Sequence, residues 1–388
     1  MRTIYFKKLI VELAGIPLYH LSKTVKKDEN IWVLGEWHGQ RYSDNSRYLY
    51  TYISKKHPEI TAVWLTKNKT IFDGLQSKSD KVFLANSFWG YYYALKAKIH
   101  IITHDAGDTN PYLSGGSILV SLTHGTPLKK LGVDAQSKRM GAFTPIFDRF
   151  ISPHLPSKRN AEIIFCANEI AATRFSSSSP NTPEVLAFGY PRWDGLTNNK
   201  THPILQDNLK KFRTVISYMP TLRFNNLVQY DPFSLEGLDQ FIKFLEANNI
   251  LLIIRPHPVM QFKCESVVSD NVIFLRSETI PDVFDILKET DILITDYSSV
   301  MYDYAILNKP IILLSPDVED YINKDVGMYG NYYEDALGPI LNNWLEIKDY
   351  LKNNKQLHNS YDEVEIEVEE GLASQRITSF LKHYINKT

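Results

Sequence analysis

The chain has 388 residues, a formal net charge of −1, 44% hydrophobic residues and 22% charged residues. This length exceeds one ordinary hydrophobic core and suits two domains, and the composition excludes a largely disordered chain. The near-neutral charge gives no general attraction to nucleic acid, so no nucleic-acid partner is expected.

The N-terminal segment from residue 3 to residue 23 has apolar side chains at mostly helical spacing, with lysines among them. This pattern predicts an amphipathic basic helix, either an ordinary surface helix packed on its domain or a membrane-surface contact. No apolar run reaches the ~18–20 residues that a spanning helix needs. The N-terminus also lacks a continuous hydrophobic region and a small-residue cleavage site, so we expect it to be retained.

Short apolar runs then alternate with helical patterns, which predicts βαβ units and parallel sheets. The first series of expected strands is Ile31–Leu34, Ala62–Leu65, Lys81–Leu84, Ile99–Ile102, Ile118–Ser121, Ile163–Phe165 and Val185–Phe188. The second is Thr214–Ser217, Ile250–Ile254, Val272–Leu275, Ile292–Thr295 and Ile311–Leu314.

A stretch rich in glycine, proline, asparagine and threonine separates the two series, so we place the domain boundary near residue 200. The prediction is an α/β protein with two Rossmann-like parallel-sheet domains, residues 1–200 and 201–388, which face each other across a cleft. A last helical pattern, Ser374 to Ile385, is apolar on one face and could pack back on the first domain.

The first chemical motif, Leu122-Thr-His-Gly-Thr-Pro-Leu-Lys129, directly follows an expected strand. A histidine at the carboxyl end of a parallel strand lies where ligands bind, which suits His124 as a general base. We expect a helix to begin near Pro127, with backbone N–H groups beside the imidazole. His-Gly alone would more often be a hydrogen-bonded turn.

The second motif, Arg255-Pro-His-Pro258, also ends an apolar strand. The two prolines restrict the backbone to extended geometry and so hold Arg255 and His257 in place. Both side chains can donate hydrogen bonds to phosphate oxygens, Arg255 through two of its N–H groups. Taken by itself, the motif could equally be a structural loop.

The third motif runs from Asp291 through Thr295-Asp-Tyr-Ser-Ser299. A strand ends at Thr295, and Ser298 and Ser299 then open an expected helix whose N-terminus can bind a diphosphate. The alternative is that Asp296 or Ser298 only caps that helix.

These three motifs, in this order and with Lys309-Pro310 downstream, resemble the CDP-glycerol glycerophosphotransferase family of teichoic-acid and capsule enzymes. Two more stretches are similar to family motifs, Gly39–Asn45 and Met219–Arg223, so the resemblance covers nearly the whole chain. The sequence departs from the family pattern at Gln40 and Arg41 (usually Lys), Leu222 (usually Trp) and Thr123 (usually Trp). These departures concern fine specificity more than the reaction.

The resemblance implies a GT-B fold with the acceptor side in the first domain and the nucleotide donor side in the second. It implies His124 as general base, with His257 as a second catalytic residue at the donor diphosphate. The implied donor-binding residues are Arg255, Ser298, Ser299, Asp296, Thr221 and Arg223. The implied residues near the acceptor are Gly125, Thr126, Lys129, Asp44 and Asn45.

The implied reaction is transfer of glycerol phosphate from CDP-glycerol to a hydroxyl of a lipid-linked saccharide, with release of CMP, at the inner face of the cell membrane. We favour a priming step over chain extension because little sequence lies beyond the two expected domains. A ribitol-phosphate transferase that uses CDP-ribitol, a polymerase of the same family, a nucleotide-sugar enzyme and a catalytically silent subunit are the alternatives.

The sequence also supports expectations about cofactors, metals and membrane contacts. No cofactor is required, and no metal site is predicted, although magnesium could assist the diphosphate. The two cysteines, Cys166 and Cys264, form no CxxC pair, which argues against a disulfide framework or zinc site. The basic, aromatic-rich stretch from Lys129 to Arg159 suits an anionic membrane surface and a phosphate-bearing acceptor.

Overall fold

The computed structural model describes residues 2–77, 81–135, 155–196, 201–221, 223, 231–257, 269–324, 327–354 and 372–387. The chain forms two compact units. Unit 1 comprises residues 1–124, 139–197 and 369–388, and unit 2 comprises residues 125–138 and 198–368. The segment 125–138 thus belongs to unit 2, although it precedes residue 200, and the last residues of the chain belong to unit 1.

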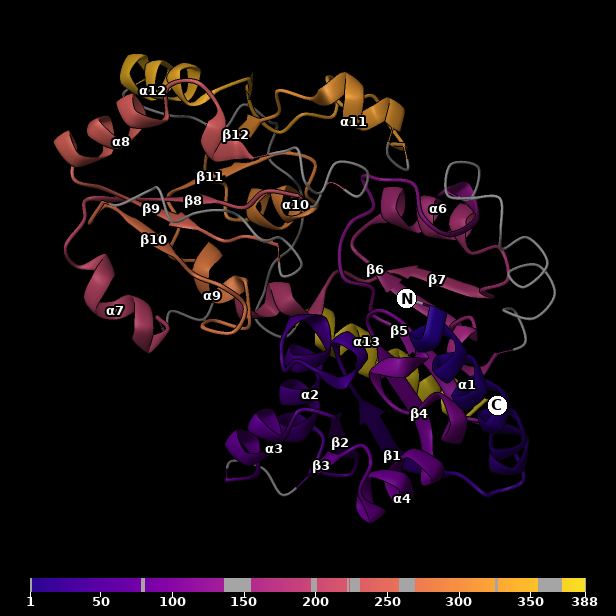
Figure 1. Cartoon of the computed structure of the whole chain (residues 1–388). Helices are drawn as coiled ribbons and strands as arrows, with labels where there is room; N and C mark the ends of the chain where they lie inside the picture. The colour runs from indigo at the N-terminus through magenta and orange to yellow at the C-terminus, as the bar shows by residue number, and fades with distance from the viewer. Residues whose placement is uncertain are drawn as a thin grey trace. The chain divides into compact units, whose positions relative to one another are not determined.

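Unit 1 is built on a parallel sheet of seven strands among the described residues, in the order β3-β2-β1-β4-β5-β6-β7 (Figure 1). Its strands are β1 (Asp28–Leu34), β2 (Thr61–Thr66), β3 (Val82–Leu84), β4 (Ala97–Ile102), β5 (Ile118–Ser121), β6 (Ile163–Cys166) and β7 (Glu184–Ala187). The chain moves outward from β1 to β3 and then returns to β4 and moves the other way. The sheet therefore has its topological switch point between β1 and β4.

The helices of unit 1 connect these strands, and several begin at a side-chain cap. Asn68, Ser87 and Asn168 each accept a backbone N–H from the first turn of the helix that follows. The helices that connect the strands are α2 (Asp44–Lys56), α3 (Lys69–Gln76), α4 (Phe88–Lys96) and α6 (Glu169–Ser178), of which α3, α4 and α6 have these caps. Strand residues such as Val33, Ile99 and Val120 are fully buried, which explains why the strands have continuous apolar sequences.

The C-terminal helix α13 (Leu372–Ile385) is part of the core of unit 1. Its Ile377 and Leu381 are fully buried in the same cluster as Trp32, and Figure 1 shows the yellow helix among the indigo and magenta elements. The Asp194 carboxylate accepts the backbone N–H groups of Ala373 and Ser374 at 3.1 and 3.0 Å and so caps this helix.

A helix, α1 (Arg2–Ser22), lies where an amphipathic basic helix was predicted. Several of its apolar side chains do not pack into unit 1, since Leu18 and Leu21 are 44% and 63% exposed, whereas the polar Glu12 is buried. In the described part of the chain, no helix combines the length and the apolar character that crossing a membrane would require.

Unit 2 repeats the architecture with a parallel sheet of six strands among the described residues, in the order β10-β9-β8-β11-β12-β13. Its strands are β8 (Thr214–Tyr218), β9 (Ile250–Ile254), β10 (Val272–Phe274), β11 (Ile292–Thr295), β12 (Ile311–Leu314) and β13 (Ile340–Leu341). Its helices are α7 (Pro203–Leu209), α8 (Leu238–Ala247), α9 (Phe284–Leu287), α10 (Val300–Ala305), α11 (Val318–Lys324) and α12 (Trp344–Asn353). The switch point lies between β8 and β11.

Lys309, in the Lys-Pro pair that follows the third motif, makes hydrogen bonds that support the fold. Lys309 Nζ donates hydrogen bonds to the carbonyl oxygens of Lys288 and Thr290, which precede β11. These carbonyls lie at the amino-terminal edge of the sheet, opposite the edge where ligands bind in such folds.

His100 on β4 makes the stability of unit 1 depend on pH. It is fully buried, its ring nitrogens contact Thr109 Oγ1 and the Ala94 carbonyl, and burial lowers its pKa to about 3. Below pH ~6.5, His100 is protonated in the unfolded chain but stays neutral in the folded chain. Protonation therefore favours unfolding, and the folded chain loses stability as the pH falls toward 3. The difference in unfolding free energy between wild type and His100→Gln should shrink by up to ~1.4 kcal/mol per pH unit in that window.

Urea denaturation at several pH values, followed for both proteins, measures this difference. A difference that stays constant from pH 7 to pH 4 would show that His100 titrates alike in the folded and unfolded chains.

Candidate active site

The polar residues of unit 1 gather at the carboxyl ends of three neighbouring strands, β1, β4 and β5. Residues 36–39 follow β1, residues 103–108 follow β4, and residues 122–124 follow β5. Because these strands lie side by side at the switch point, their following loops meet at one edge of the sheet.

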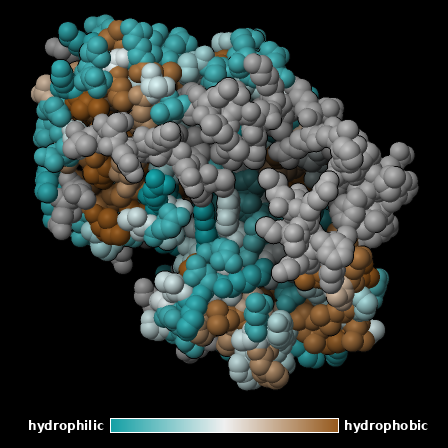
Figure 2. All heavy atoms as spheres, viewed as in Figure 1, coloured by the Kyte–Doolittle hydropathy of each residue, from teal (hydrophilic) through white to brown (hydrophobic). Residues whose placement is uncertain are grey.

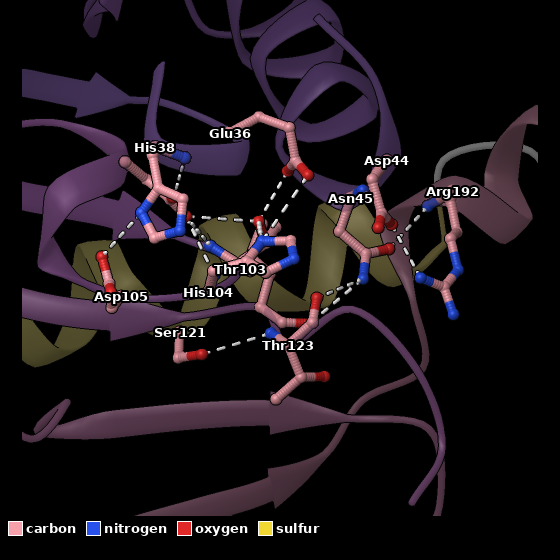
Figure 3. Close-up of polar contacts among 12 residues, drawn as sticks. Glu36, His38, Asp44, Asn45, Thr103, His104, Asp105, Ser121, Thr123 and Arg192 are labelled. Carbon is pink, nitrogen blue, oxygen red and sulfur yellow. Dashed lines mark hydrogen bonds and ion pairs between the residues drawn. The ribbon is translucent and has the colours of Figure 1, made fainter. Parts of the chain in front are cut away.

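A buried network of carboxylates and hydroxyls forms the base of this cluster (Figure 3). Thr103 Oγ1 donates to Glu36 Oε2 at 2.6 Å, and Glu36 is 1% exposed. Asp108 accepts three backbone N–H groups, from His38, Thr103 and His104. Burial, reinforced by the charges of Asp44 and Asp108, raises the pKa of Glu36 well above its usual range. Glu36 is therefore positioned to remain a neutral acid.

His124 is exposed, and its imidazole stacks on His104 with 4.5 Å between ring centroids and 6° between planes. Trp37 also packs against His104, edge to face, with 4.5 Å between the ring centroids. His104 Nδ1 lies 3.0 Å from Thr103 Oγ1 and 3.8 Å from a carboxylate oxygen of Glu36. Burial, together with repulsion from His124, lowers the pKa of His104 to about 2. A neutral ring thus supports His124 without adding positive charge.

His38 and Asp105 form a more exposed pair beside the stack, with 3.3 Å between Nδ1 and Oδ1. The hydrogen bond to Asp105 raises the pKa of His38. Burial alone would raise the pKa of Asp105, but the hydrogen bond and charge of His38 outweigh it and lower that pKa. His38, Asp105 and Asp108 offer three ligand atoms within 4.8 Å of one another. Asp108 already accepts three backbone N–H groups, so we assign these residues to the hydrogen-bond network and propose no metal site.

Asn45, one of the residues expected near the acceptor, holds the segment that ends in His124. Its side-chain amide donates to the carbonyl oxygens of Leu122 and Thr123 at 3.1 and 3.0 Å. Asn45 Oδ1 accepts the backbone N–H of Arg192. The Arg192 guanidinium in turn lies 2.7 Å from the Asp44 carboxylate (Figure 3). This support matters because Thr123 has a left-handed backbone conformation, φ 53°, which costs energy for a β-branched residue.

Replacing Asn45 with alanine should therefore destabilise unit 1 and misplace His124. Asn45 is fully buried, and its loss leaves two carbonyls and one N–H without these bonds. We expect a loss of about 1–3 kcal/mol of unfolding free energy, measured by urea denaturation. Asn353→Ala, at the exposed end of α12, is the matched control and should change stability by less than about 0.5 kcal/mol. An equally small change for Asn45→Ala would show that the carbonyls find other donors.

The residues that follow His124 correct one sequence-based expectation. No helix begins at Pro127; residues 122–131 have no helical assignment, and Gly132–Ala135 is a single 3-10 turn. Gly125, Thr126 and Lys129 belong to unit 2, where Lys129 forms an antiparallel bridge with Met328. Pairing with another strand of chain satisfies backbone groups that a helix would have used. The expected helix N–H groups beside His124 are therefore absent from this described segment.

Unit 2 gathers its polar residues around Asp296, at the end of β11. Asp296 is fully buried and accepts the backbone N–H groups of Thr221 and Tyr297. Arg223 Nη1 lies 2.6 Å from Asp296 Oδ2, and Arg223 Nε lies 3.0 Å from Asp317 Oδ2. The guanidinium also packs over the rings of Tyr297 and Tyr321, 4.7 and 5.2 Å from their centroids.

Direct contact of Asp296 and Arg223 with a donor stays a prediction, because in this structure they bind each other. Thr221 is more available, since its buried Oγ1 has no hydrogen-bond partner among the described residues. A buried hydroxyl without a partner is a natural contact for a ligand oxygen.

The other predicted donor residues follow β9 and β11. Arg255 is half-buried, and its guanidinium donates to the carbonyl oxygens of Leu275 and Pro281 at 3.0 and 3.4 Å. His257 and both serines are half-buried as well. The expected helix does follow the serines as α10, which has six residues, and Ser298 Oγ lies 3.4 Å from the Val300 N–H. Phosphate binding by these residues stays a prediction.

Most of the basic, aromatic-rich stretch after His124 lies outside the described residues, which resume at residue 155. Cys264 lies outside them too, and Cys166 is buried, with its thiol pKa raised to about 12 by burial.

Sequence reasoning missed the residues that surround His124. Glu36, His38, Thr103, His104, Asp105 and Asp108 were not predicted as site residues. The available signal was their position directly after the strands at Ile31–Leu34 and Ile99–Ile102, the same argument that identified His124. What was lacking was the strand order, which makes these loops neighbours.

Two parallel α/β units, each with polar residues at the switch point of its sheet, define a protein of the GT-B fold class, as expected from the resemblance. Residues 18–382 match the profile of the family described as CDP-glycerol:poly(glycerophosphate) glycerophosphotransferase. The chain therefore belongs to this family.

Relatives and solved structures agree with this assignment. The chain is 26% identical over 396 residues to a teichoic acid glycerol-phosphate transferase of Staphylococcus aureus, covering 96% of this chain and 98% of that protein. It is 30% identical over 383 residues to a teichoic acid poly(glycerol phosphate) polymerase of Staphylococcus epidermidis, covering 92% of this chain but only 52% of that protein. A variant of the wall teichoic acid polymerase TagF superposes with a TM-score of 0.75 at 26% identity, covering 99% of this chain and 97% of the other.

Proposed function

We propose that this protein transfers glycerol phosphate from CDP-glycerol to a hydroxyl of a membrane-borne, lipid-linked saccharide and releases CMP. The observation that carries the proposal is the exposed His124 at the switch point of unit 1, stacked on the neutral His104. Family membership supports the donor, and a TagF structure soaked with CDPG, at a TM-score of 0.72, supports it further.

The chemistry follows from the groups available. The acceptor oxygen attacks the phosphorus that bears glycerol, a new P–O bond forms, and the bond to the bridging oxygen of CMP breaks. His124 takes the acceptor proton as general base, a role typically worth about 10²–10⁴-fold in rate. Positioning and neutralisation of phosphate charge supply most of the remaining acceleration.

In this proposal unit 1 binds the acceptor and unit 2 binds the donor. Arg255, His257 and the serines Ser298 and Ser299 contact the diphosphate, and Thr221 offers its Oγ1, which has no hydrogen-bond partner among the described residues. Asp296 and Arg223 act by holding the loop after β8 in place through their ion pair.

The product is one or a few glycerol phosphates on a linker, that is, a priming step in teichoic-acid or capsule synthesis at the inner face of the cell membrane. Chain extension is the competing outcome, because an S. aureus glycerol-phosphate transferase and a Bacillus spizizenii poly(glycerol phosphate) polymerase both align end to end with this chain. Ribitol-phosphate polymerases also match part of the chain, so CDP-ribitol is the competing donor.

The test is CMP release from purified protein given CDP-glycerol or CDP-ribitol with a lipid-linked saccharide, with products sized by mass spectrometry. Acceptor-dependent release from CDP-glycerol, with products heavier by one or a few glycerol phosphates, supports the proposal. Release only from CDP-ribitol would replace the donor, and long products would make the protein a polymerase. Protein that binds CDP-glycerol and never releases CMP would overturn the transferase assignment.

A further inference from the structure

Unit 1 contains a cavity of about 830 Å³ beside the candidate active site. It lies between α1, α4 and the segment around Pro111–Leu113, with contributions from the loops after β1 and β4. Its size is within the ~300–1,000 Å³ typical of sites for small organic ligands. Most of its wall area is apolar, with contributions from Val11 and Leu18 of α1, Phe88, Tyr91 and Tyr92 of α4, and Tyr112.

The polar end of the cavity is the edge of the candidate active site. His38, Asp105 and Gly107 line it, and His38 is the outer member of the ring cluster, 6.2 Å from His104 between centroids. His104 stacks in turn on His124. An occupant that fills this end therefore lies two rings away from the proposed base.

Two lysines give this end a place for negative charge. Lys67 Nζ donates to the Gly107 carbonyl at 2.8 Å, which leaves two of its three protons for an occupant. Lys158, an exposed residue, lines the same end. Asp105 is already paired with His38, so its charge does not cancel both lysines. A phosphate group is the anion that such a pair of ammonium groups suits.

A buried carboxylate indicates that the cavity is built to hold something polar as well. Glu12 on α1 is 5% exposed and lines the cavity, and its Oε2 has no hydrogen-bond partner among the described residues. Glu12 also contacts the Tyr112 hydroxyl, and burial together with Glu12 raises the pKa of Tyr112 to about 12. A buried carboxylate oxygen without a donor costs stability, and a hydroxyl of an occupant would satisfy it.

The surface beside the cavity is apolar. Val11, Leu13, Leu18 and Leu21 of α1 are 44–63% exposed, and Phe88, Trp89, Tyr91 and Tyr92 of α4 are 41–75% exposed. Figure 2 shows apolar side chains, in brown, over the region where Figure 1 draws these two helices. Trp and Tyr next to leucines and lysines are typical of surfaces that meet a lipid headgroup layer. Val11, Leu18, Phe88, Tyr91 and Tyr92 belong both to this exposed surface and to the cavity wall, so the apolar surface reaches the cavity.

We propose that this cavity is the acceptor pocket and that it takes a phosphate-bearing amphiphile with hydroxyl groups. The hydrocarbon chain lies along the aromatic wall of α1 and α4, the phosphate meets Lys67 and Lys158, and a hydroxyl donates to Glu12. This inference rests on the proposed function for the identity of the occupant as the acceptor. The binding property itself can be measured without turnover.

The experiment compares three probes for saturable binding to the full chain by isothermal titration calorimetry, and the two probes with a hydrocarbon chain are kept below their micelle concentrations. Lauroyl-lysophosphatidylglycerol has a chain, a phosphate and hydroxyls, dodecyl maltoside lacks the phosphate, and glycerol 3-phosphate lacks the chain. We expect the first probe to bind at least tenfold more tightly than either of the others, because only it uses both ends of the cavity.

Two variants and two matched controls localise the binding. Phe88→Ala/Tyr92→Ala should weaken both chain-bearing probes at least fivefold, whereas Tyr333→Ala, another exposed aromatic residue, should leave them unchanged. Lys158→Ala should weaken the phosphate-bearing probes about fivefold and leave dodecyl maltoside unchanged, and Lys352→Ala on α12 should have no effect. Circular dichroism of each variant monitors the fold.

The outcomes separate this inference from the proposed function. Equal loss in variants and controls, or equal affinity for the lyso-lipid and dodecyl maltoside, would overturn the pocket. Transfer from CDP-glycerol with an acceptor KM unchanged in Phe88→Ala/Tyr92→Ala would also overturn it while the proposed function stands. Site-dependent binding of the lyso-lipid in a protein that never uses CDP-glycerol would keep the pocket and reject the proposed function.

Discussion

Replacing His124 with asparagine is expected to lower the rate of CMP release by about 10²–10⁴-fold. The side chain is exposed at the end of β5, and its stacking partner His104 is neutral because burial lowers the pKa of His104 to about 2. Burial thus rules out His104 as the base of this ring pair and leaves the exposed His124 for that role. Asparagine keeps a polar side chain but cannot act as a base.

The loss should appear in kcat, because a general base acts in the transition state and not in donor binding. The Kd for CDP-glycerol, measured by calorimetry, should stay within about twofold, since we assign donor binding to unit 2. His383→Ala, an exposed histidine near the end of α13, is the control and should keep wild-type turnover. Wild-type turnover in His124→Asn would remove this residue from the mechanism.

The central strands of both sheets were predictable from the sequence because they are buried on both faces, whereas the half-buried two-residue edge strand β13 was missed. Such strands have unbroken apolar runs, as in Ile250–Ile254, where all five residues are buried. Motifs that directly follow these runs could therefore be placed at the carboxyl edge of a sheet. His124 was found in this way.

The rest of the site depends on contacts that have no local signature. Glu36 and His104 are 68 positions apart in the chain and meet only because β1 and β4 are neighbours at the switch point. Asn45 shows the same limit, since its sequence motif did not reveal that its amide holds the carbonyls of Leu122 and Thr123. Burial could not be predicted either. Asp296 is polar and was therefore expected to contact a substrate, but the structure buries it fully.

Both units use their switch point in the same physical way, with a buried carboxylate that fixes a loop. In unit 1, Asp108 collects the backbone N–H groups of His38, Thr103 and His104. In unit 2, Asp296 collects those of Thr221 and Tyr297. Each carboxylate orders the polar groups that follow the strands, which leaves the more exposed residues, such as His124, to contact substrates.

The ion pair of Arg223 should therefore matter more for stability than for contact with the donor. Arg223→Met removes the partner of Asp296, which is fully buried, and one partner of Asp317. Removing one partner of a buried ion pair typically costs about 3–5 kcal/mol. We expect a loss of this size in the unfolding free energy of unit 2, measured by urea denaturation with and without CDP-glycerol.

Companion variants distinguish the lost ion pair from lost volume. Arg223→Met/Asp296→Asn should recover part of the stability, because it removes the unpaired charge together with its partner. Arg223→Lys should recover little, since an ammonium cannot span Asp296, Asp317 and the Thr221 carbonyl as the guanidinium does. Arg276→Met, at an exposed position, should change stability by less than about 0.5 kcal/mol. If Arg223→Met were as stable as wild type but bound CDP-glycerol at least tenfold more weakly, Arg223 would be a donor ligand and the structural role assigned here would be wrong.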